Sequence, residues 1–359
     1  MLLKYIFLIP IINVSYISYS LAILFTTFFL KSLFLKRTKA STINPRPINI
    51  SILIPIYNEE ENLPRLINSF YNDDSYPKCE IIFINDLSTD KSLSILQKNQ
   101  SKYKYKLVEN VKKGCYVAGV LNEGLKHVDH KSNYVGVING DCTFRKDLLN
   151  NVISELMEKD ISILNLSNIS YYTNVCEYVA YLEKIFKNGL FKTAEASLNN
   201  GYFIKKSILL EVGGWNKDIL TEDLELNLRL KNHGYTIHQS DLQIIDSVPK
   251  SFNKLFNQKY RWIKGDIINR YKYYPKDLFE LIVNTYYIFP LFSLIALIIS
   301  PFIVLRNIFF IQILIFFVEG SLFYKFTKNI GNSIVYPFTQ FIFSLYFYIK
   351  FFLNNSDNW

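Results

Sequence analysis

The sequence predicts an α/β domain with a doubly wound mixed sheet, joined to about four transmembrane helices, one N-terminal and three C-terminal. Three observations lead to this fold class. Short apolar runs alternate with helical patterns between residues 48 and 274. Long, nearly uncharged apolar stretches stand on both sides of that region. Hydrophobic residues make up 50% of the 359 residues and aromatic residues 16%, more apolar material than an ordinary soluble enzyme needs.

Apolar runs rich in β-branched residues predict the strands of the sheet. They cover residues 49–55, 80–84 and 134–138, and each is bounded by polar or turn-forming residues, as buried parallel strands are. Between them, helices are predicted from Leu63, Leu66, Ile67 and Phe70 at i, i+3, i+4 and i+7, and over residues 117–126 and 147–158. In such sheets ligands bind outside the carboxyl ends of the strands.

Four apolar stretches are each long enough to span a bilayer. They cover residues 6–30, 281–299, 301–318 and 334–353. A signal peptide is the alternative for the first stretch. Its apolar run is longer than a typical signal-peptide core, and no clear small-residue cleavage site follows it, so a membrane helix is the prediction.

Basic residues beside these stretches predict how the chain is oriented. Lys31, Lys36, Arg37 and Lys39 follow the first stretch, and Lys325 and Lys328 separate the last two. If both groups are cytoplasmic, as the positive-inside rule expects, the central domain is cytoplasmic and both termini are outside. We therefore predict a multi-pass protein of the cell membrane with the lipid bilayer as a partner. Its ranges are 1–40 for the N-terminal helix and basic flank, 45–275 for the cytoplasmic domain and 276–359 for the C-terminal membrane region.

Charge and cysteine usage narrow the class of protein further. The net charge is +9, but Lys and Arg are spread among acidic residues without a block of like charges, so no nucleic-acid partner is predicted. The four cysteines are Cys79, Cys115, Cys142 and Cys176. None forms a CxxC pair, which predicts free buried thiols in a reducing compartment. His127 and His130 are predicted to be solvated, because no further ligands complete a metal site around them.

Polar residues follow the first two predicted strands. Tyr57 and Glu59 come after the first, where Asn58 as a helix N-cap and glutamates in the first helical turn are the plain interpretation. In a functional interpretation, Tyr57 stacks on a base and a carboxylate such as that of Glu59 accepts hydrogen bonds from the base or ribose. Asp86 follows the second strand, where a nucleoside is commonly held, although a polar turn would need the same residues.

The run Asn139-Gly140-Asp141 follows the strand predicted at 134–138. A carboxylate there can bind a divalent cation that also bridges two phosphates, and Mg²⁺ and Mn²⁺ favour such oxygen ligands. A three-residue motif of this kind also occurs by chance.

Two later motifs complete the set. Asp223 ends the run Thr221-Glu222-Asp223, and it is either one of the acids at a helix N-terminus or a general base for a hydroxyl. Gln258, Arg261 and Trp262 stand before the apolar C-terminal region. Trp and Arg near a membrane are usually interfacial anchors, but Arg also suits a diphosphate and Trp a sugar ring.

In this order and spacing the five motifs resemble those of the inverting family-2 glycosyltransferases, in particular the membrane branch with cellulose, chitin and hyaluronan synthases. The resemblance runs from Ser51 to about Gly265. It implies a nucleotide-sugar-binding GT-A fold, with Asp86 in the nucleotide pocket, Asp141 on a Mg²⁺ or Mn²⁺ ion, and Asp223 as the base. It places Gln258, Arg261 and Trp262 at the acceptor and diphosphate.

Three positions depart from the family pattern. Asn85 replaces the commoner Asp, and Asn139 replaces the first Asp of the D-x-D motif, which leaves one carboxylate for the metal. Val117 stands where many relatives have a Lys, and Lys112 and Lys113 are candidates to compensate, although their spacing does not prove it.

The resemblance implies transfer of a sugar, with inversion, from a nucleotide-sugar donor, and UDP is the nucleotide expected by resemblance only. The predicted acceptor is a growing glycan. One alternative is a single-sugar transferase acting on a lipid-linked acceptor, such as a polyprenyl phosphate. A second is an inactive membrane scaffold that only binds the nucleotide-sugar. The sequence names neither the sugar nor the acceptor.

Overall fold

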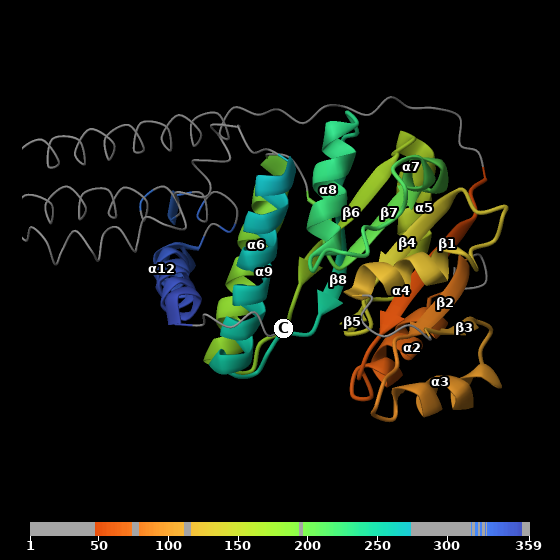
Figure 1. Ribbon diagram of the computed structural model, residues 1–359, viewed down its shortest axis with the longest axis horizontal. Coiled ribbons are helices and arrows are strands. Elements are labelled where there is room, and N and C mark those ends of the chain that lie inside the picture. The colour runs from red at the N-terminus through yellow and green to blue at the C-terminus, as the bar shows by residue number, and fades with distance from the viewer. Residues whose placement is uncertain are drawn as a thin grey trace, which may run out of the picture. The chain divides into compact units, whose positions relative to one another are not determined.

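The computed structural model describes residues 47–73, 79–110, 116–193, 197–273 and 329–353, with single residues between 317 and 327 (Figure 1). The chain forms two compact units. One comprises Arg37–Thr173 and Leu190–Pro249, and it contains the sheet. The other comprises Met1–Lys36, Asn174–Gly189 and Lys250–Trp359. The ranges predicted for three domains, 1–40, 45–275 and 276–359, stay a prediction.

The sheet has eight strands in the order β3-β2-β1-β4-β7-β6-β8-β5. Their bounds are Ile50–Ile56 (β1), Cys79–Asn85 (β2), Lys106–Glu109 (β3), Tyr134–Ile138 (β4), Cys142–Thr143 (β5), Ile163–Ile169 (β6), Gly201–Lys205 (β7) and His238–Asp246 (β8). Strands β3, β2, β1 and β4 are parallel, as are β6 and β8, whereas β7 and β5 run antiparallel to their neighbours. The mixed sheet and the three predicted strands are confirmed.

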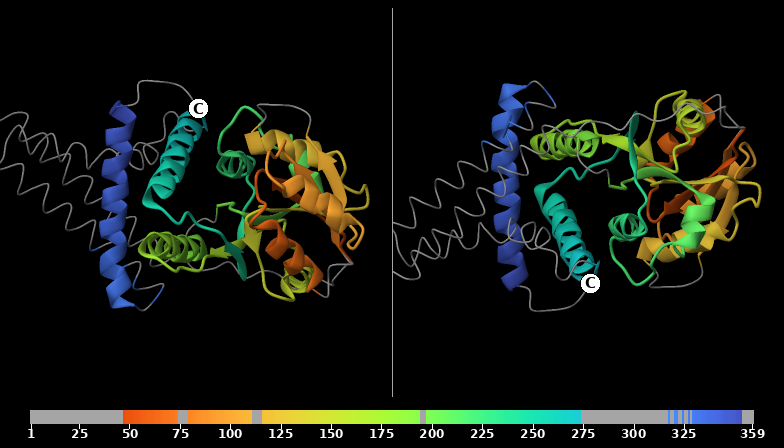
Figure 2. Two further views of the ribbon diagram at one scale, coloured as in Figure 1. Left: turned by 90° about the horizontal axis from the view of Figure 1, so that it is seen from below. Right: turned by 90° about the horizontal axis from the view of Figure 1, so that it is seen from above.

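Helices cover both faces of the curled sheet (Figures 1 and 2). They are α2 (Leu63–Tyr71), α3 (Ser92–Gln100), α4 (Tyr116–Leu125), α5 (Leu148–Lys159), α7 (Lys206–Glu211) and α8 (Glu222–Asn232). One apolar core joins α2, α3 and α5 to one face, and a second joins α4, α7 and α8 to the other. All four apolar residues predicted to form the inner stripe of α2 are buried, which confirms that helix from its spacing.

The strand directions place six carboxyl ends at one edge of the sheet. These are the ends of β1, β2, β3, β4, β6 and β8, because the two antiparallel pairings of β7 leave β6 and β8 parallel to β4. The amino end of β7 lies at the same edge. Polar residues that follow these strands are therefore gathered along one edge although they are far apart in the chain.

The predicted cap of the first helix is wrong. Helix α2 begins at Leu63 with Asn62 at the N-cap, whereas Asn58 lies earlier with φ of 55° in the left-handed region. The side-chain oxygen of Asn58 instead accepts a hydrogen bond from the backbone N–H of Thr89, at 2.8 Å. Asn tolerates this backbone conformation better than most residues, and here it joins two loops rather than starting a helix.

The fold class predicted from the sequence needs a correction, because it included transmembrane helices. Among the described residues, no helix combines the length and the apolar character needed to cross a membrane. The stretch 334–353 lies on helix α12 (Ile330–Leu353), where polar residues such as Gln340 and Lys350 interrupt the apolar ones and Pro337 stands inside the helix. The stretches predicted at 6–30, 281–299 and 301–318 lie outside the described residues, apart from residue 317.

The second compact unit contains three described helices, α6 (Val175–Thr193), α9 (Phe252–Tyr273) and α12, and the first turns of α6 follow the unit boundary at Asn174. Aromatic rings connect α12 to the other two. Phe186 stacks on Tyr336 with ring centroids 4.5 Å apart, and Phe256 stacks on Tyr346 at 4.3 Å. Offset ring stacking adds to the stabilisation that comes from burying these large side chains.

Candidate functional site

Two loops at the carboxyl edge are joined by hydrogen bonds. One follows β1 and carries Tyr57 and Glu59, and the other follows β2 and carries Asp86. Besides the bond from Thr89 to Asn58, the Glu60 N–H donates to Asp90 Oδ2 at 3.0 Å, and the Lys91 N–H donates to Glu60 Oε2 at 3.0 Å. The loops therefore hold each other in place, and Tyr57 remains 60% exposed at this edge, where its ring is open to a ligand.

Asp86 is oriented by a residue that sequence reasoning missed. The Asn110 side-chain amide donates to Asp86 Oδ1 at 2.6 Å, and the Asn110 backbone N–H donates to the carbonyl of Asn85 at 2.9 Å. Asn110 is buried and follows β3, the next strand along the edge. The rule that finds Asp86, a polar residue directly after a strand, also finds Asn110, but the short strand 106–109 was not predicted.

Asp141 lies beside two further groups that could hold a metal ion. Oxygen or sulfur atoms of Asp141, Cys142 and Asp246 all lie within 4.8 Å of one another. Asp246 ends β8 and is buried, and its backbone is paired with Cys142 of β5. Sequence reasoning assigned only Asp141 and missed Asp246, which is a carboxylate at the end of a strand like the others.

Asn139, in the position of the absent first carboxylate, supports this group through a chain of amides. Its side-chain amide donates to Asn200 Oδ1 at 3.1 Å, and the Asn200 amide donates to Asp246 Oδ2 at 2.7 Å. Asn168 donates to the same oxygen at 3.2 Å. Two side-chain amides therefore fix the orientation of the Asp246 side chain.

Glu59 lies closer to this acidic group than the sequence suggested. A Cβ added at Gly140 would lie 3.2 Å from Glu59 Cγ and 2.6 Å from Ile56 Cδ1, so only glycine allows the two loops to approach this closely. Burial raises the pKa of Glu59, and the charges of Asp90 and Asp246 raise it further, against the lowering effect of a hydrogen bond from Asn62. A bound cation would relieve this repulsion between carboxylates.

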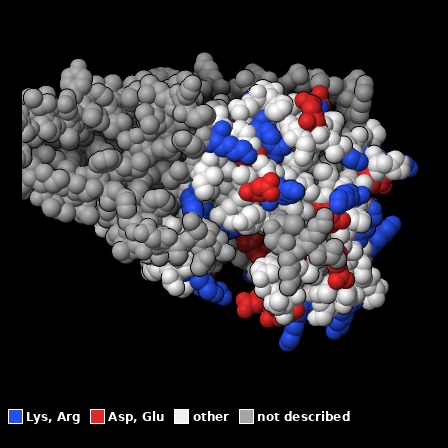
Figure 3. Space-filling view, in the orientation of Figure 1, with Lys and Arg blue, Asp and Glu red and all other residues white. Residues whose placement is uncertain are grey.

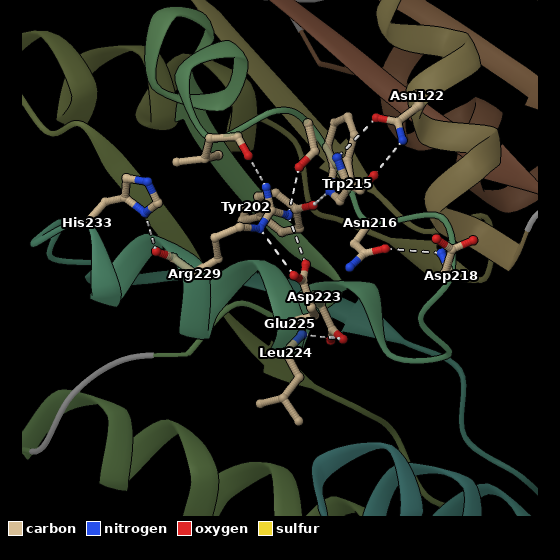
Figure 4. A network of polar contacts seen from close by, with 12 residues as sticks. Asn122, Tyr202, Trp215, Asn216, Asp218, Asp223, Leu224, Glu225, Arg229 and His233 are labelled. Carbon is tan, nitrogen blue, oxygen red and sulfur yellow. Dashed lines mark hydrogen bonds and ion pairs between the residues drawn. The ribbon is translucent and has the colours of Figure 1, made fainter. Parts of the chain in front are cut away.

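Asp223 lies at the start of α8, and its own loop is fixed by a buried ion pair (Figure 4). Arg229 donates to Glu225 Oε1 at 3.2 Å and to Oε2 at 2.8 Å, with the Glu225 side chain fully buried. The same guanidinium donates to the backbone carbonyls of Val212 and Gly214. One arginine thereby ties helix α8 to the loop that precedes it.

Asn122 and Trp215 fix the other side of that loop (Figure 4). The Asn122 amide donates to the Trp215 carbonyl at 2.6 Å, and the Trp215 N–H donates back to Asn122 Oδ1 at 3.0 Å. Gly214 has φ of 71°, and a Cβ there would lie 2.6 Å from Asn122 Oδ1. Gly213 has φ of 84°, so both glycines before Trp215 are favoured by their backbone conformation, and Gly214 also by close approach.

Tyr202 is a buried residue of β7 on which the charge of Asp223 acts. Its hydroxyl accepts a hydrogen bond from Trp215 Nε1 at 2.7 Å. Burial raises the pKa of Tyr202, and the charges of Glu222 and Asp223 raise it further. Tyr202 is the second residue of β7, whose first residue pairs with Ile138, so Tyr202 stands one residue from the edge that carries Asn139, and the charge of Asp223 acts on its hydroxyl.

Gln258, Arg261 and Trp262 lie on α9 in the other compact unit. Within that unit, Lys259 and Lys187 place their amines over the Trp262 ring, at 4.5 and 5.1 Å from its centroid. Glu183 forms ion pairs with both lysines, at 2.9 Å for Lys187. Burial lowers the pKa of Lys259 to about 7, whereas the contact with Glu183 favours the charged amine. Arg261 is exposed.

The remaining expectations concern cysteine, histidine and surface charge. Cys79, Cys142 and Cys176 are buried thiols outside any disulfide, as predicted, and Cys115 lies outside the described residues. The side chains of His127 and His130 are 47% and 86% exposed, which confirms that they are solvated. Positive and negative side chains are interspersed over the described part of the face in Figure 3, as their spread along the sequence predicts.

Comparison with solved structures identifies the class of fold. Mannosyltransferase PcManGT from Pyrobaculum calidifontis, solved in complex with GDP-Man and Mn²⁺, matches over 96% of this chain and 99% of its own, with a TM-score of 0.62 and 14% identity. The fold, a curled mixed sheet between helices, is therefore GT-A-like.

Family models identify the family itself. Residues 51–204 match Glycosyl transferase family 2, and residues 135–347, more than half of the chain, match Glycosyl transferase family group 2. The chain belongs to glycosyltransferase family 2.

Two relatives show how widely members differ. Poly-beta-1,6-N-acetyl-D-glucosamine synthase of Staphylococcus epidermidis is 28% identical over 227 residues, which are 60% of this chain and 54% of the relative. Beta-monoglucosyldiacylglycerol synthase of Synechocystis sp. is 26% identical over 246 residues, 63% of this chain and 49% of the relative. The chain thus spans about half the length of the curated relatives it matches.

Proposed function

We propose that this protein transfers a sugar from a nucleotide-sugar to an acceptor hydroxyl, with inversion at the anomeric carbon. The observation that carries the proposal is the set of groups at one sheet edge, Asp86 and the Asp141 and Asp246 side chains, together with Asp223 at the start of α8. The proposal assigns Asp86 to the nucleoside, Asp141 and Asp246 to a cation, and Asp223 to the role of general base. Membership of the family supports the same activity.

The donor is proposed to bind across the loops after β1 and β2. The Tyr57 ring is exposed there and offers a face for the base, while Asp86 is held by Asn110 so that its second oxygen can accept a hydrogen bond from the nucleoside. UDP is the proposed nucleotide by resemblance. Glu59 lies near the charges of Asp90 and Asp246, which raise its pKa, so it is a weaker candidate than Asp86 for contact with the nucleoside.

Asp141 and Asp246 together fit a divalent ion, since two carboxylates offer the oxygen ligands that Mg²⁺ and Mn²⁺ prefer. When bound, such an ion offsets the charge on the departing nucleoside diphosphate. Asn139 acts in this proposal as a support for Asp246 through Asn200 rather than as a ligand. This arrangement supplies the second carboxylate that the departure at Asn139 removes.

Asp223 is proposed as the general base that takes the proton from the acceptor hydroxyl in a single displacement, which inverts the anomeric centre. Such a base contributes typically ~10²–10⁴ in rate. Arg261 is proposed to stabilise the leaving diphosphate, with Gln258 and Trp262 at the acceptor, as the family motif implies. An exposed guanidinium suits that role because it is available to a ligand.

The acceptor separates two candidate functions. A growing glycan is the proposal, and the poly-N-acetylglucosamine synthase among the relatives supports it. The second candidate is a single transfer to a lipid-linked acceptor, which the glucolipid synthase among the relatives supports. The lysines over the Trp262 ring also favour this second candidate, because a cation on an aromatic face competes with a sugar for it.

A donor panel on the purified protein tests the proposal. UDP- and GDP-linked sugars would be supplied in turn with Mn²⁺, with Mg²⁺ or with EDTA, and products would be sized by mass spectrometry. Transfer or slow donor hydrolysis that EDTA abolishes is the expected result. If no donor is consumed while nucleotide binding is intact, the protein is a binding scaffold. A single added sugar under excess donor would favour the lipid-linked acceptor.

A further inference from the structure

Cys142 lies beside the Asp141 and Asp246 side chains because of the way two strands pair. Strand β5 pairs antiparallel with β8, and Cys142 stands directly opposite Asp246. Residues directly opposite in an antiparallel pair project their side chains to the same face, with Cβ atoms about 4.5–5.5 Å apart. The sulfur and the Asp246 carboxylate are therefore neighbours by construction of the sheet.

The contacts of the thiol extend beyond packing. Cys142 is fully buried and belongs to the apolar core beneath the edge, which a packing role alone would explain. Its Sγ also lies 3.7 Å from Asp141 Oδ1, where the thiol donates to the carboxylate. One side of the sulfur thus faces the core, and another faces an oxygen that the proposed function assigns to a metal ion.

The separation of sulfur and oxygen fits joint coordination of one ion. Zinc-type bonds of about 2.3 Å to sulfur and about 2.1 Å to oxygen place two ligands of a tetrahedral ion about 3.6 Å apart. The observed 3.7 Å agrees with this, and the 4.8 Å spread of the whole group needs only small side-chain movements to close. Loss of the thiol proton to solvent would accompany metal binding.

We propose that Cys142 supplies a sulfur ligand to the divalent ion held by Asp141 and Asp246, and that this ligand makes the site select Mn²⁺ and softer ions over Mg²⁺. The inference rests on the proposed function for the presence of the ion. Mg²⁺ demands oxygen ligands in octahedral geometry, whereas thiolate ligands favour softer ions. A serine or alanine at this position would leave two carboxylates, which suit Mg²⁺ as well as Mn²⁺.

Titration of the purified protein with Cd²⁺ tests for the sulfur ligand without any need for activity. A thiolate bound to Cd²⁺ gives an ultraviolet charge-transfer band, which oxygen ligands do not. The band is expected in the wild type, and it should be lost in both Cys142→Ser and Cys142→Ala. It should persist in Cys79→Ser, Cys115→Ser and Cys176→Ser. A band that survives at full strength in both Cys142 variants would overturn the proposal.

Cation preference gives the second readout. Calorimetry with UDP should show affinity at least ~10-fold higher with Mn²⁺ than with Mg²⁺ in the wild type, and Cys142→Ala should bring the two affinities within about 3-fold of each other. Equal preference in wild type and variant would overturn the inference. The alanine variant keeps an apolar side chain in the core, and its melting temperature without metal reports whether it folds. A wild-type protein that gives no Cd²⁺ band but still transfers sugar would overturn this inference and leave the proposed function standing.

Discussion

Asp223 is the residue on which the proposed chemistry depends most directly. Asp223→Asn keeps the size of the side chain but cannot accept a proton, so transfer should fall by ~10²–10⁴ while nucleotide affinity stays within a few-fold. Single-turnover rates and calorimetry with UDP measure the two effects. Glu222→Gln, a change at the preceding residue of the same helical turn, is the matched control and should retain most of the rate. Near-normal turnover in Asp223→Asn would remove it from the role of base.

Asp141 and Asp246 give a second prediction at the scale of single residues. Asp141→Ala should abolish the metal-dependent part of UDP affinity, because one remaining carboxylate binds a hard cation poorly. Asp246→Asn should weaken it as well, although the sequence motif contains only Asp141. Calorimetry with Mn²⁺ and with EDTA provides the measurement. If Asp246→Asn binds as tightly as the wild type while Asp141→Ala does not, the ion is held without Asp246.

Helix α8 is held to its preceding loop by the Glu225–Arg229 pair, which is an element-scale feature. Arg229→Met leaves the fully buried Glu225 carboxylate without its partner cation and should cost about 3–5 kcal/mol of unfolding free energy. The double variant Glu225→Leu/Arg229→Met removes both charges and should be less destabilised than the single one. Urea unfolding of the whole protein compares them. A double variant as unstable as the single one would show that the arginine acts through the carbonyls of Val212 and Gly214.

Glu155 joins helix α5 to strand β8 and makes stability depend on pH. Burial raises the pKa of its carboxyl group, but hydrogen bonds from His238, Lys159 and Ser240 together lower it to about 2. Because this is below the ordinary 4.5 of an unfolded chain, the carboxylate stabilises the fold above pH 4.5, and the contribution is lost as the pH falls from about 4.5 to about 2.

The test of this contribution is Glu155→Gln. At pH 7 the variant should be about 2–3 kcal/mol less stable than the wild type, and the difference should shrink as the pH falls below 4.5. Urea unfolding at several pH values gives the comparison, with the exposed Glu158→Gln on the same helix as control. A difference that is constant over the pH range would mean that the loss comes from packing and not from the charge.

At the scale of the whole molecule, the number of sugars added in one binding event is still a prediction. In a processive enzyme, Trp262→Ala should shorten the product more than it slows the first transfer, and Arg261→Ala should slow every transfer. A different result is expected if the lysines keep the Trp262 ring covered. Lys187→Gln should then leave the length of the product unchanged. Trp262→Ala should act only by loosening the contact between α6 and α9. Product sizing beside initial rates decides between these outcomes. The predicted location of the protein in the cell also stays a prediction.

Local patterns were sufficient to predict most elements of the sheet-bearing unit. The strands at Ile50–Ile56, Cys79–Asn85 and Tyr134–Ile138 and the helix at Leu63–Tyr71 follow from the spacing of apolar residues within short segments. The family could be inferred for a similar reason, because its motifs are short runs of neighbouring residues, three of them directly after predictable strands and two on helices. The same local reasoning failed on residues 334–353, where apolar content suggested a transmembrane helix, although interspersed polar residues make α12 too polar for one.

Strand order and register decided the composition of the site, and neither follows from a local pattern. Asp246 joins Asp141 because β8 runs parallel to β6 and pairs with β5, and that pairing also sets Cys142 opposite Asp246. Asn110 reaches Asp86 because β3 lies next to β2, and Arg229 reaches Gly214 because α8 folds back on its loop. Motif spacing along the chain therefore identifies the family and a first carboxylate. Pairing between distant strands supplies the second carboxylate, the sulfur and the groups that orient them, because a sheet brings together residues that the chain keeps far apart.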